Sequence, residues 1–289
     1  MRVRAILCCG IALLVAASTT QAAYTYIVES RVSGGAQNSL FTLSGLATTT
    51  AKSTASGLTG TGSYYAGDTT PVKWGEWSYT PAAGNGGYYD VYGTWATNTY
   101  ASGVTPPTWT VHNAGADVVV QIAQTSGANA WNTLATGVKL NAGTAYTTRL
   151  ATAATGLSNK RTYFDSVRWV ASTPGAPTNV QPANGSTTVP QTGPGNELSW
   201  AAGACSSFFD VFLDTNTNPT TKVGSNLTGT SFDPDSLGLL PNQTYYWKVV
   251  AKNVDVSTSG TVWSFTTTPE PVTMLFLGLG GLLLRRRRA

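Results

Sequence analysis

Charged residues are scarce in this chain of 289 residues. Asp, Glu, Lys and Arg together make up 10% of it, whereas about 25% is usual for soluble globular domains. Hydroxyl and amide side chains must therefore cover most of the surface, and long runs of the helix formers Glu, Lys and Gln are absent. Short strands joined by turns of Gly, Thr, Ser and Asn fit this composition best. The sequence therefore predicts an all-β protein.

Cysteine and histidine are scarcer still, which limits the chemistry that the chain can perform. Of the three cysteines, Cys8 and Cys9 lie in an apolar leader, so Cys205 is the single thiol of the remaining chain. An internal disulfide is then excluded, and a lone cysteine before an apolar strand is expected to pack rather than react. One histidine, His112, and scattered carboxylates give no triad, acid and base pair or metal cluster. We therefore predict no catalysis, no cofactor and no metal.

The basic excess of the chain comes from its two ends. The net charge is +4, but six of the 17 basic side chains lie in residues 1–22 and 285–289, and residues 23–284 hold 11 basic and 13 acidic side chains, a net charge of −2. A nucleic-acid-binding protein needs a basic face to neutralise phosphates. The sequence therefore predicts no nucleic-acid partner.

The N-terminal residues 1–22 have the layout of a secretory signal peptide. Arg2 and Arg4 precede an apolar run from Ala5 to Ala17, and small residues follow near Ala22. The run is shorter than the roughly 20 residues that span a bilayer, so we expect export and cleavage by signal peptidase. A retained anchor is the alternative.

The C-terminal residues 269–289 combine three features in a fixed order: a Pro-Glu-Pro motif, an apolar run from Met274 to Leu284 and an arginine cluster. The motif residues are Pro269, Glu270, Pro271, Arg285, Arg286, Arg287 and Arg288. This segment resembles the PEP-CTERM sorting signal, which implies recognition by an exosortase after export and a place in the cell envelope or extracellular matrix. The arginines would stay on the cytoplasmic side of the membrane. Eleven apolar residues favour a transient membrane helix, and an ordinary tail anchor is the alternative.

Residues 23–172 contain segments that alternate between apolar and polar side chains. In 88–95, for example, Tyr89, Val91 and Trp95 share one face and are expected to be buried. Similar segments follow at 108–112, 118–123, 133–140, 146–150 and 163–170. Gly and Pro turns separate most of them, which favours a β-sandwich over alternating strands and helices. We expect Trp109 and Trp169 to be core residues like Trp95.

This part of the chain resembles the golvesin C-terminal-like domain, also described as a xanthan-lyase carbohydrate-binding-like domain. The residues that carry the resemblance are Gly87–Trp95, Trp109–Gly115, Trp131–Leu134 and Phe164–Val170. The sequence departs from that family in 120–124, where an acidic residue usually precedes Gln, and in the long loop 97–107. The resemblance implies a jelly-roll-like sandwich that binds polysaccharide.

Sugar recognition requires aromatic faces for stacking and polar side chains for hydrogen bonds. The first module offers both outside the clearest strand segments, and we select as ligand-binding candidates Trp74, Trp77, Tyr100, Tyr64, Tyr65, Asp68 and Glu76. Trp74, Trp77 and Tyr100 are expected in loops, and the sequence leaves open whether each ring is buried or exposed.

Residues 173–268 follow a Pro- and Gly-containing linker and again show short strands separated by turns. This second module resembles a bacterial fibronectin type III domain on three segments, Leu198–Trp200, Leu239–Tyr245 and Trp263–Thr267. The resemblance implies an immunoglobulin-like sandwich with a tyrosine corner at Tyr245 and a role as a spacer. In 245–251, alternation places Trp247 in the core.

Three functions remain open at this point. The first is an exported, non-catalytic surface or matrix protein that binds polysaccharide through the first module. The second is a purely structural scaffold without a glycan ligand. The third, a polysaccharide lyase or hydrolase, would require convergent carboxylates or a basic cluster in one cleft, which the sequence does not show.

Overall fold

A computed structural model describes residues 23–45, 47–101 and 105–268. The predicted signal peptide and the predicted sorting signal lie outside these residues. Within the described ranges, no helix has the length and apolar character needed to cross a membrane.

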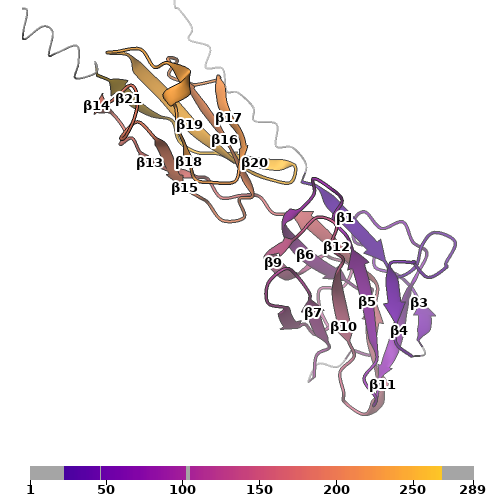
Figure 1. Ribbon diagram of the computed structural model, residues 1–289. Helices are drawn as coiled ribbons and strands as arrows, with labels where there is room; N and C mark the ends of the chain where they lie inside the picture. Colours follow the sequence, from indigo (N-terminus) through magenta and orange to yellow (C-terminus); the bar gives the residue numbers. More distant parts are fainter. Residues whose placement is uncertain (1–22, 46, 102–104, 269–289) are drawn as a thin grey trace, which may run out of the picture.

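The described chain is all-β, as predicted, and its strands form two sandwiches joined end to end (Figure 1). The described helical structure is one short 3-10 turn, Asp235–Leu237. Two separate clusters of buried apolar side chains form the two cores.

The first sandwich packs a four-stranded sheet against a five-stranded sheet, and both are antiparallel. The four-stranded sheet has the order β1 (Thr25–Glu29), β12 (Ser166–Ala171), β6 (Gly87–Thr94), β9 (Asn132–Leu140). The five-stranded sheet has the order β2 (Phe41–Leu43), β5 (Trp74–Tyr79), β10 (Tyr146–Ala151), β7 (Thr108–Val111), β8 (Val118–Gln121). A third sheet consists of β11 (Leu157–Phe164), β4 (Ser63–Asp68) and β3 (Thr48–Thr50).

Tryptophan and tyrosine rings fill the space between the two larger sheets. Trp95, Trp109 and Trp169 are fully buried, which confirms the prediction that they are core residues. The ring of Tyr79 lies 5.4 Å from that of Trp169 and so joins the two sheets across the core. Rings of this size each bury about 150–250 Å², so they dominate the stability of this sandwich.

The second sandwich has one sheet of three strands and one of six. The first contains β13 (Thr178–Gln181), β15 (Leu198–Ala201) and β18 (Ser231–Phe232). The second contains β14 (Ser186–Val189), β21 (Trp263–Thr267), β19 (Thr244–Asn253), β16 (Phe208–Asp214) and β17 (Lys222–Leu227), with β20 (Val256–Ser259) also paired to β19.

Strand β19 has the predicted alternation. Tyr245, Trp247, Val249 and Ala251 are all buried, and Trp247 is fully enclosed. The hydroxyl of Tyr245 accepts a hydrogen bond from the backbone N–H of Leu240 at 2.9 Å, which is the bond that defines a tyrosine corner.

The turn between β19 and β20 joins the two sandwiches. Val256 lies in the core of the first sandwich although it belongs to a strand of the second. The neighbouring Asn253 is fully buried, and its side-chain amide binds both the backbone N–H and the backbone C=O of Tyr88, each at 2.8 Å. Asp255 accepts a hydrogen bond from the backbone N–H of Tyr24 at 2.9 Å. No local sequence pattern predicts these contacts.

Candidate functional site

Two of the predicted ligand residues are buried, and the expectation that they could contact a ligand was wrong. Trp77 lies on β5 rather than in a loop, and its fully buried ring packs 5.6 Å from that of Trp109. Its indole N–H donates to the backbone oxygen of Asp165. Because β5 begins at Trp74, side-chain alternation along the strand points Trp77 toward the core of the first sandwich.

Asp68 is the second buried candidate. Its side chain is 1% exposed, and the hydroxyl of Thr162 donates to it at 2.7 Å. Burial raises the pKa of this carboxyl, and the hydrogen bond from Thr162 opposes the rise only in part. Asp68 therefore belongs to the interior of the first sandwich.

Trp74 and Glu76 lie together on the outward face of the five-stranded sheet. Both are half-buried and separated along β5 by one inward residue, so they point the same way. Arg149 on β10 is the direct cross-strand partner of Glu76, and its Nε atom lies 2.7 Å from Glu76 Oε2. The guanidinium of Arg149 also lies 4.3 Å from the centre of the Trp74 ring. The three side chains thus form one connected group.

Hydroxyl side chains surround this group on the same face. In the register of the sheet, Thr42 on β2 lies opposite Glu76, and Thr110 on β7 lies opposite Arg149. Thr108 lies opposite Ala151, the partner of Trp74. We call this surface the Trp74 face and define it by Thr42, Trp74, Glu76, Thr108, Thr110 and Arg149. It offers an aromatic ring, guanidinium donors and a row of hydroxyls.

The predicted tyrosines lie off the Trp74 face, because Tyr64 and Tyr65 belong to β4 of the third sheet and Tyr100 lies in a turn. Tyr65, on β4, and Tyr100 have their ring centres each 4.3 Å from the guanidinium of Arg161, which therefore lies against both rings. Tyr100 is 47% exposed. Tyr64 packs instead against Phe41 at 6.1 Å and beneath Arg31 at 5.6 Å.

Arginine is the functional residue type that the sequence reasoning missed. Each arginine among the described residues lies over at least one aromatic ring: Arg31, Arg149, Arg161 and Arg168. Strand alternation in 146–151 could have placed Arg149 outward. Its partners Trp74 and Glu76 could not have been found in this way, because they come from a strand about 70 residues away in sequence.

Groups with catalytic potential do not converge at the Trp74 face. Burial raises the pKa of Asp165 to about 6, but this carboxyl is 1% exposed and accepts hydrogen bonds from Ser53 and Ser166. His112 forms an exposed ion-pair contact with Asp117, 2.9 Å from Nδ1 to Oδ2. In the described ranges, no three His, Cys, Asp or Glu side chains are grouped so as to hold a metal ion.

Comparison with known proteins gives weak likenesses. No family model and no curated protein matches the chain. A Paenibacillus xanthan lyase structure is 24% identical, covering 50% of this chain and 13% of the lyase, with a TM-score of 0.40. A beta-1,2-glucanase from Parabacteroides distasonis is 10% identical, covering 87% of this chain and 38% of the glucanase, with a TM-score of 0.25.

A glycoside hydrolase domain, Endo-D from Streptococcus pneumoniae R6, is also 10% identical, with coverages of 79% and 37% and a TM-score of 0.22. In all three cases the chain spans less than two fifths of the other protein's length. Likenesses of this size identify neither a family nor an activity for this chain.

Proposed function

We propose that the chain is an exported, non-catalytic protein of the cell surface or extracellular matrix that binds polysaccharide through the Trp74 face. The observation that carries the proposal is the position of Arg149, which is held between the carboxylate of Glu76 and the ring of Trp74. A guanidinium fixed in this way loses little further side-chain entropy when it binds a ligand.

The remaining chemistry of the face matches a sugar chain. The Nε atom of Arg149 is engaged by Glu76, which leaves the terminal guanidinium nitrogens to donate to sugar hydroxyls or ring oxygens. Trp74 supplies apolar ring surface for the C–H groups of a pyranose. Because Glu76 compensates the charge of Arg149, we expect preference for neutral sugars.

Export, sorting and the spacer role are parts of the same proposal. We infer that the leader is removed by signal peptidase, that an exosortase processes the C-terminal segment after transient membrane insertion, and that the fibronectin-like second sandwich separates the binding module from the surface. Pulse labelling of the chain in its bacterial host, with and without a functional exosortase, tests this part. A native chain that stays inside the cell with both ends uncut would contradict it.

Affinity electrophoresis tests the binding. The full chain is run through gels that contain the host exopolysaccharide or one of a panel of neutral polysaccharides. We expect retardation of the wild type and at least about a tenfold loss of affinity for Trp74→Ala and Arg149→Ala, about 1.4 kcal/mol or more. Tyr100→Ala is the matched control, because Tyr100 also contacts an arginine but lies off the Trp74 face. Equal loss in all three variants would contradict the assignment.

A matrix scaffold without a glycan ligand is the second candidate function. The buried contacts of Asn253 favour it, because they fix the two sandwiches end to end as a structural element requires. If no polysaccharide, including that of the host, retards the wild-type chain, the scaffold replaces the binding function. The same polysaccharides, assayed for new reducing ends and unsaturated products, should remain uncleaved.

A further inference from the structure

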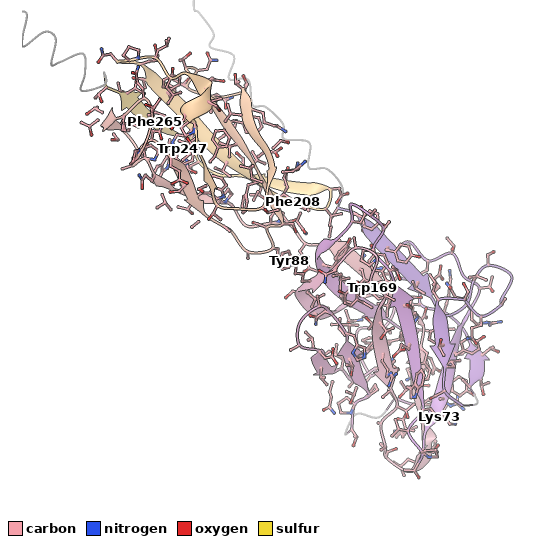
Figure 2. All side chains as sticks on the ribbon, viewed as in Figure 1. Lys73, Tyr88, Trp169, Phe208, Trp247 and Phe265 are labelled. Atoms are coloured by element: carbon pink, nitrogen blue, oxygen red, sulfur yellow. The ribbon has the colours of Figure 1, made fainter. Side chains whose placement is uncertain are left out.

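The junction of the two sandwiches contains a groove in addition to the buried contacts of Asn253. One hollow of about 450 Å³ is lined from the first sandwich by Tyr88 and Lys139 and from the second by Ser206 and Phe208. A second hollow of about 470 Å³ shares Gly86, Ala142 and Phe208 with the first. The two hollows therefore adjoin along Phe208, which we treat as the centre of one junction groove. Figure 2 labels Tyr88 and Phe208 on the two sides of the junction.

The lining of the junction groove suits a saccharide. Tyr88 and Phe208 are both half-buried, so each presents part of a ring to the groove. Asn141, Ser206 and Thr228 add amide and hydroxyl groups to the first hollow. Partly exposed aromatic rings interspersed with hydrogen-bonding groups are what a sugar chain needs. Ligand sites also occur preferentially at interfaces between domains.

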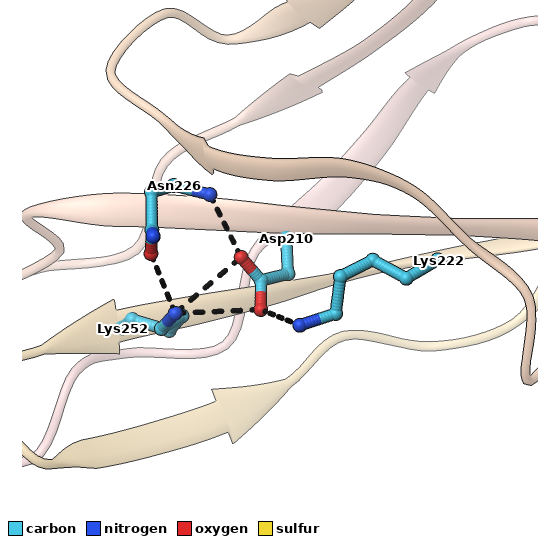
Figure 3. A network of polar contacts seen from close by, with 4 residues as sticks. All are labelled: Asp210, Lys222, Asn226 and Lys252. Carbon is cyan, nitrogen blue, oxygen red and sulfur yellow. Dashed lines mark hydrogen bonds and ion pairs between the residues drawn. The ribbon is translucent and has the colours of Figure 1, made fainter.

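The charge of the junction groove is positive. Lys139 and Lys252 line it, and no Asp or Glu does so among the lining residues of the two hollows. Lys252 lies 3.4 Å from the carboxylate of Asp210 and 2.6 Å from the side-chain oxygen of Asn226, as Figure 3 shows. Lys139 is exposed, and its Nζ atom lies 5.9 Å from the centre of the Tyr88 ring. Lys139 is therefore the cation available to an anionic ligand.

The junction groove is preformed because hydrogen bonds of Asn253, at the end of β19, hold the two sandwiches together beside it. Asn253 occupies the space beside Gly87, where any side chain would collide with its amide oxygen. The same amide also donates to Ser172 at 2.7 Å and accepts from the hydroxyl of Ser207 at 3.0 Å. A groove held by buried hydrogen bonds loses little entropy on binding.

We propose that the junction groove is a second saccharide site, distinct from the Trp74 face, that binds an acidic oligosaccharide. Phe208 and Tyr88 contact the sugar rings, and Lys139 pairs with a uronate carboxylate. The Trp74 face holds its arginine already paired with Glu76, so the two sites differ in the charge they select.

Calorimetric titration of the full chain with tetragalacturonic acid, and with maltotetraose as the neutral probe, tests this site. We expect saturable binding of the acidic probe that weakens as salt is raised. Phe208→Ala and Lys139→Gln should each lower the affinity at least about tenfold. Lys139 is exposed, so its variant is expected to fold normally and keeps the test valid if Phe208→Ala is unstable.

Matched controls come from the same strands of the second sandwich. Phe212 follows Phe208 by four residues on the same face of β16, and Lys248 precedes Lys252 by four residues on β19, but neither lines the groove. Phe212→Ala and Lys248→Gln should change the affinity less than about twofold. The proposal is overturned if the acidic probe does not bind, or if Trp74→Ala abolishes its binding while Phe208→Ala and Lys139→Gln do not.

Discussion

The amide of Asn253 is the single group on which the orientation of the two sandwiches depends most. Its oxygen accepts from the backbone of Tyr88 and the hydroxyl of Ser207, and its nitrogen donates to the carbonyls of Tyr88 and Ser172. The side chain is fully buried, so water cannot replace it in the folded protein. Replacement by alanine therefore removes four hydrogen bonds at once.

The cost of Asn253→Ala follows from the groups it leaves without partners. The carbonyl of Tyr88 keeps a bond from the backbone N–H of Ser172 at 3.0 Å. The N–H of Tyr88 and the carbonyl of Ser172 lose the partner that Asn253 supplies. Each buried unsatisfied group costs about 1–3 kcal/mol. We therefore expect the variant to weaken the junction by about 2–6 kcal/mol, with the cores of both sandwiches intact.

Residual dipolar couplings measured by NMR report the consequence directly. In the wild type, one alignment tensor should fit the amide groups of both sandwiches, because the junction is rigid. In Asn253→Ala, each sandwich should require a tensor of its own. Asn218→Ala is the matched control, because Asn218 is exposed and its side chain accepts a hydrogen bond from Lys248 within the second sandwich, away from the junction. A single shared tensor for Asn253→Ala, together with an unchanged melting temperature, would refute this account of the junction.

Three further predictions concern stability. Trp247→Ala removes a fully buried ring and should lower the free energy of unfolding by about 3–5 kcal/mol; an unchanged urea midpoint would show that the ring is not in the core. The pKa of Asp165, raised to about 6 by burial, makes the native state bind its proton more tightly than the unfolded state, so stability should fall by about 3 kcal/mol as the pH rises from about 4 to 6. Asp165→Asn should abolish that dependence in pH-resolved calorimetry, and retention of the slope would contradict the assignment. Burial raises the pKa of Asp210, but hydrogen bonds from Lys222 and the backbone of Asn226 outweigh this effect and lower the pKa overall. The ionised carboxylate therefore stabilises the fold near neutral pH, and this stabilisation should be lost as the pH falls below about 4. In pH-resolved calorimetry, Asp210→Asn should not show that loss.

Much of the fold could be predicted from the sequence because it depends on local patterns. A period of two in 88–95 and 245–251 determines which side chains face a core, and the buried Tyr89, Val91 and Trp247 follow that rule. The scarcity of charge and the frequent Gly turns are properties of composition, and they were sufficient for the all-β prediction.

The candidate sites were decided by tertiary structure, because they depend on which strands become neighbours. Sheet register brings Arg149 onto Glu76 and Trp74, and no local pattern encodes that pairing. The error at Trp77 has the same origin: its exposure depended on where β5 begins, which the flanking residues leave open.

The junction is the clearest case of what only the three-dimensional structure decides. In the sequence, Asn253 and Val256 flank an ordinary turn between two strands. In the structure, Asn253 binds the backbone of Tyr88, 165 residues earlier in the chain, and Val256 packs in the core of the first sandwich. Sequence patterns report burial within an element, because side chains of one strand share its geometry. They do not report which distant surface that element will meet.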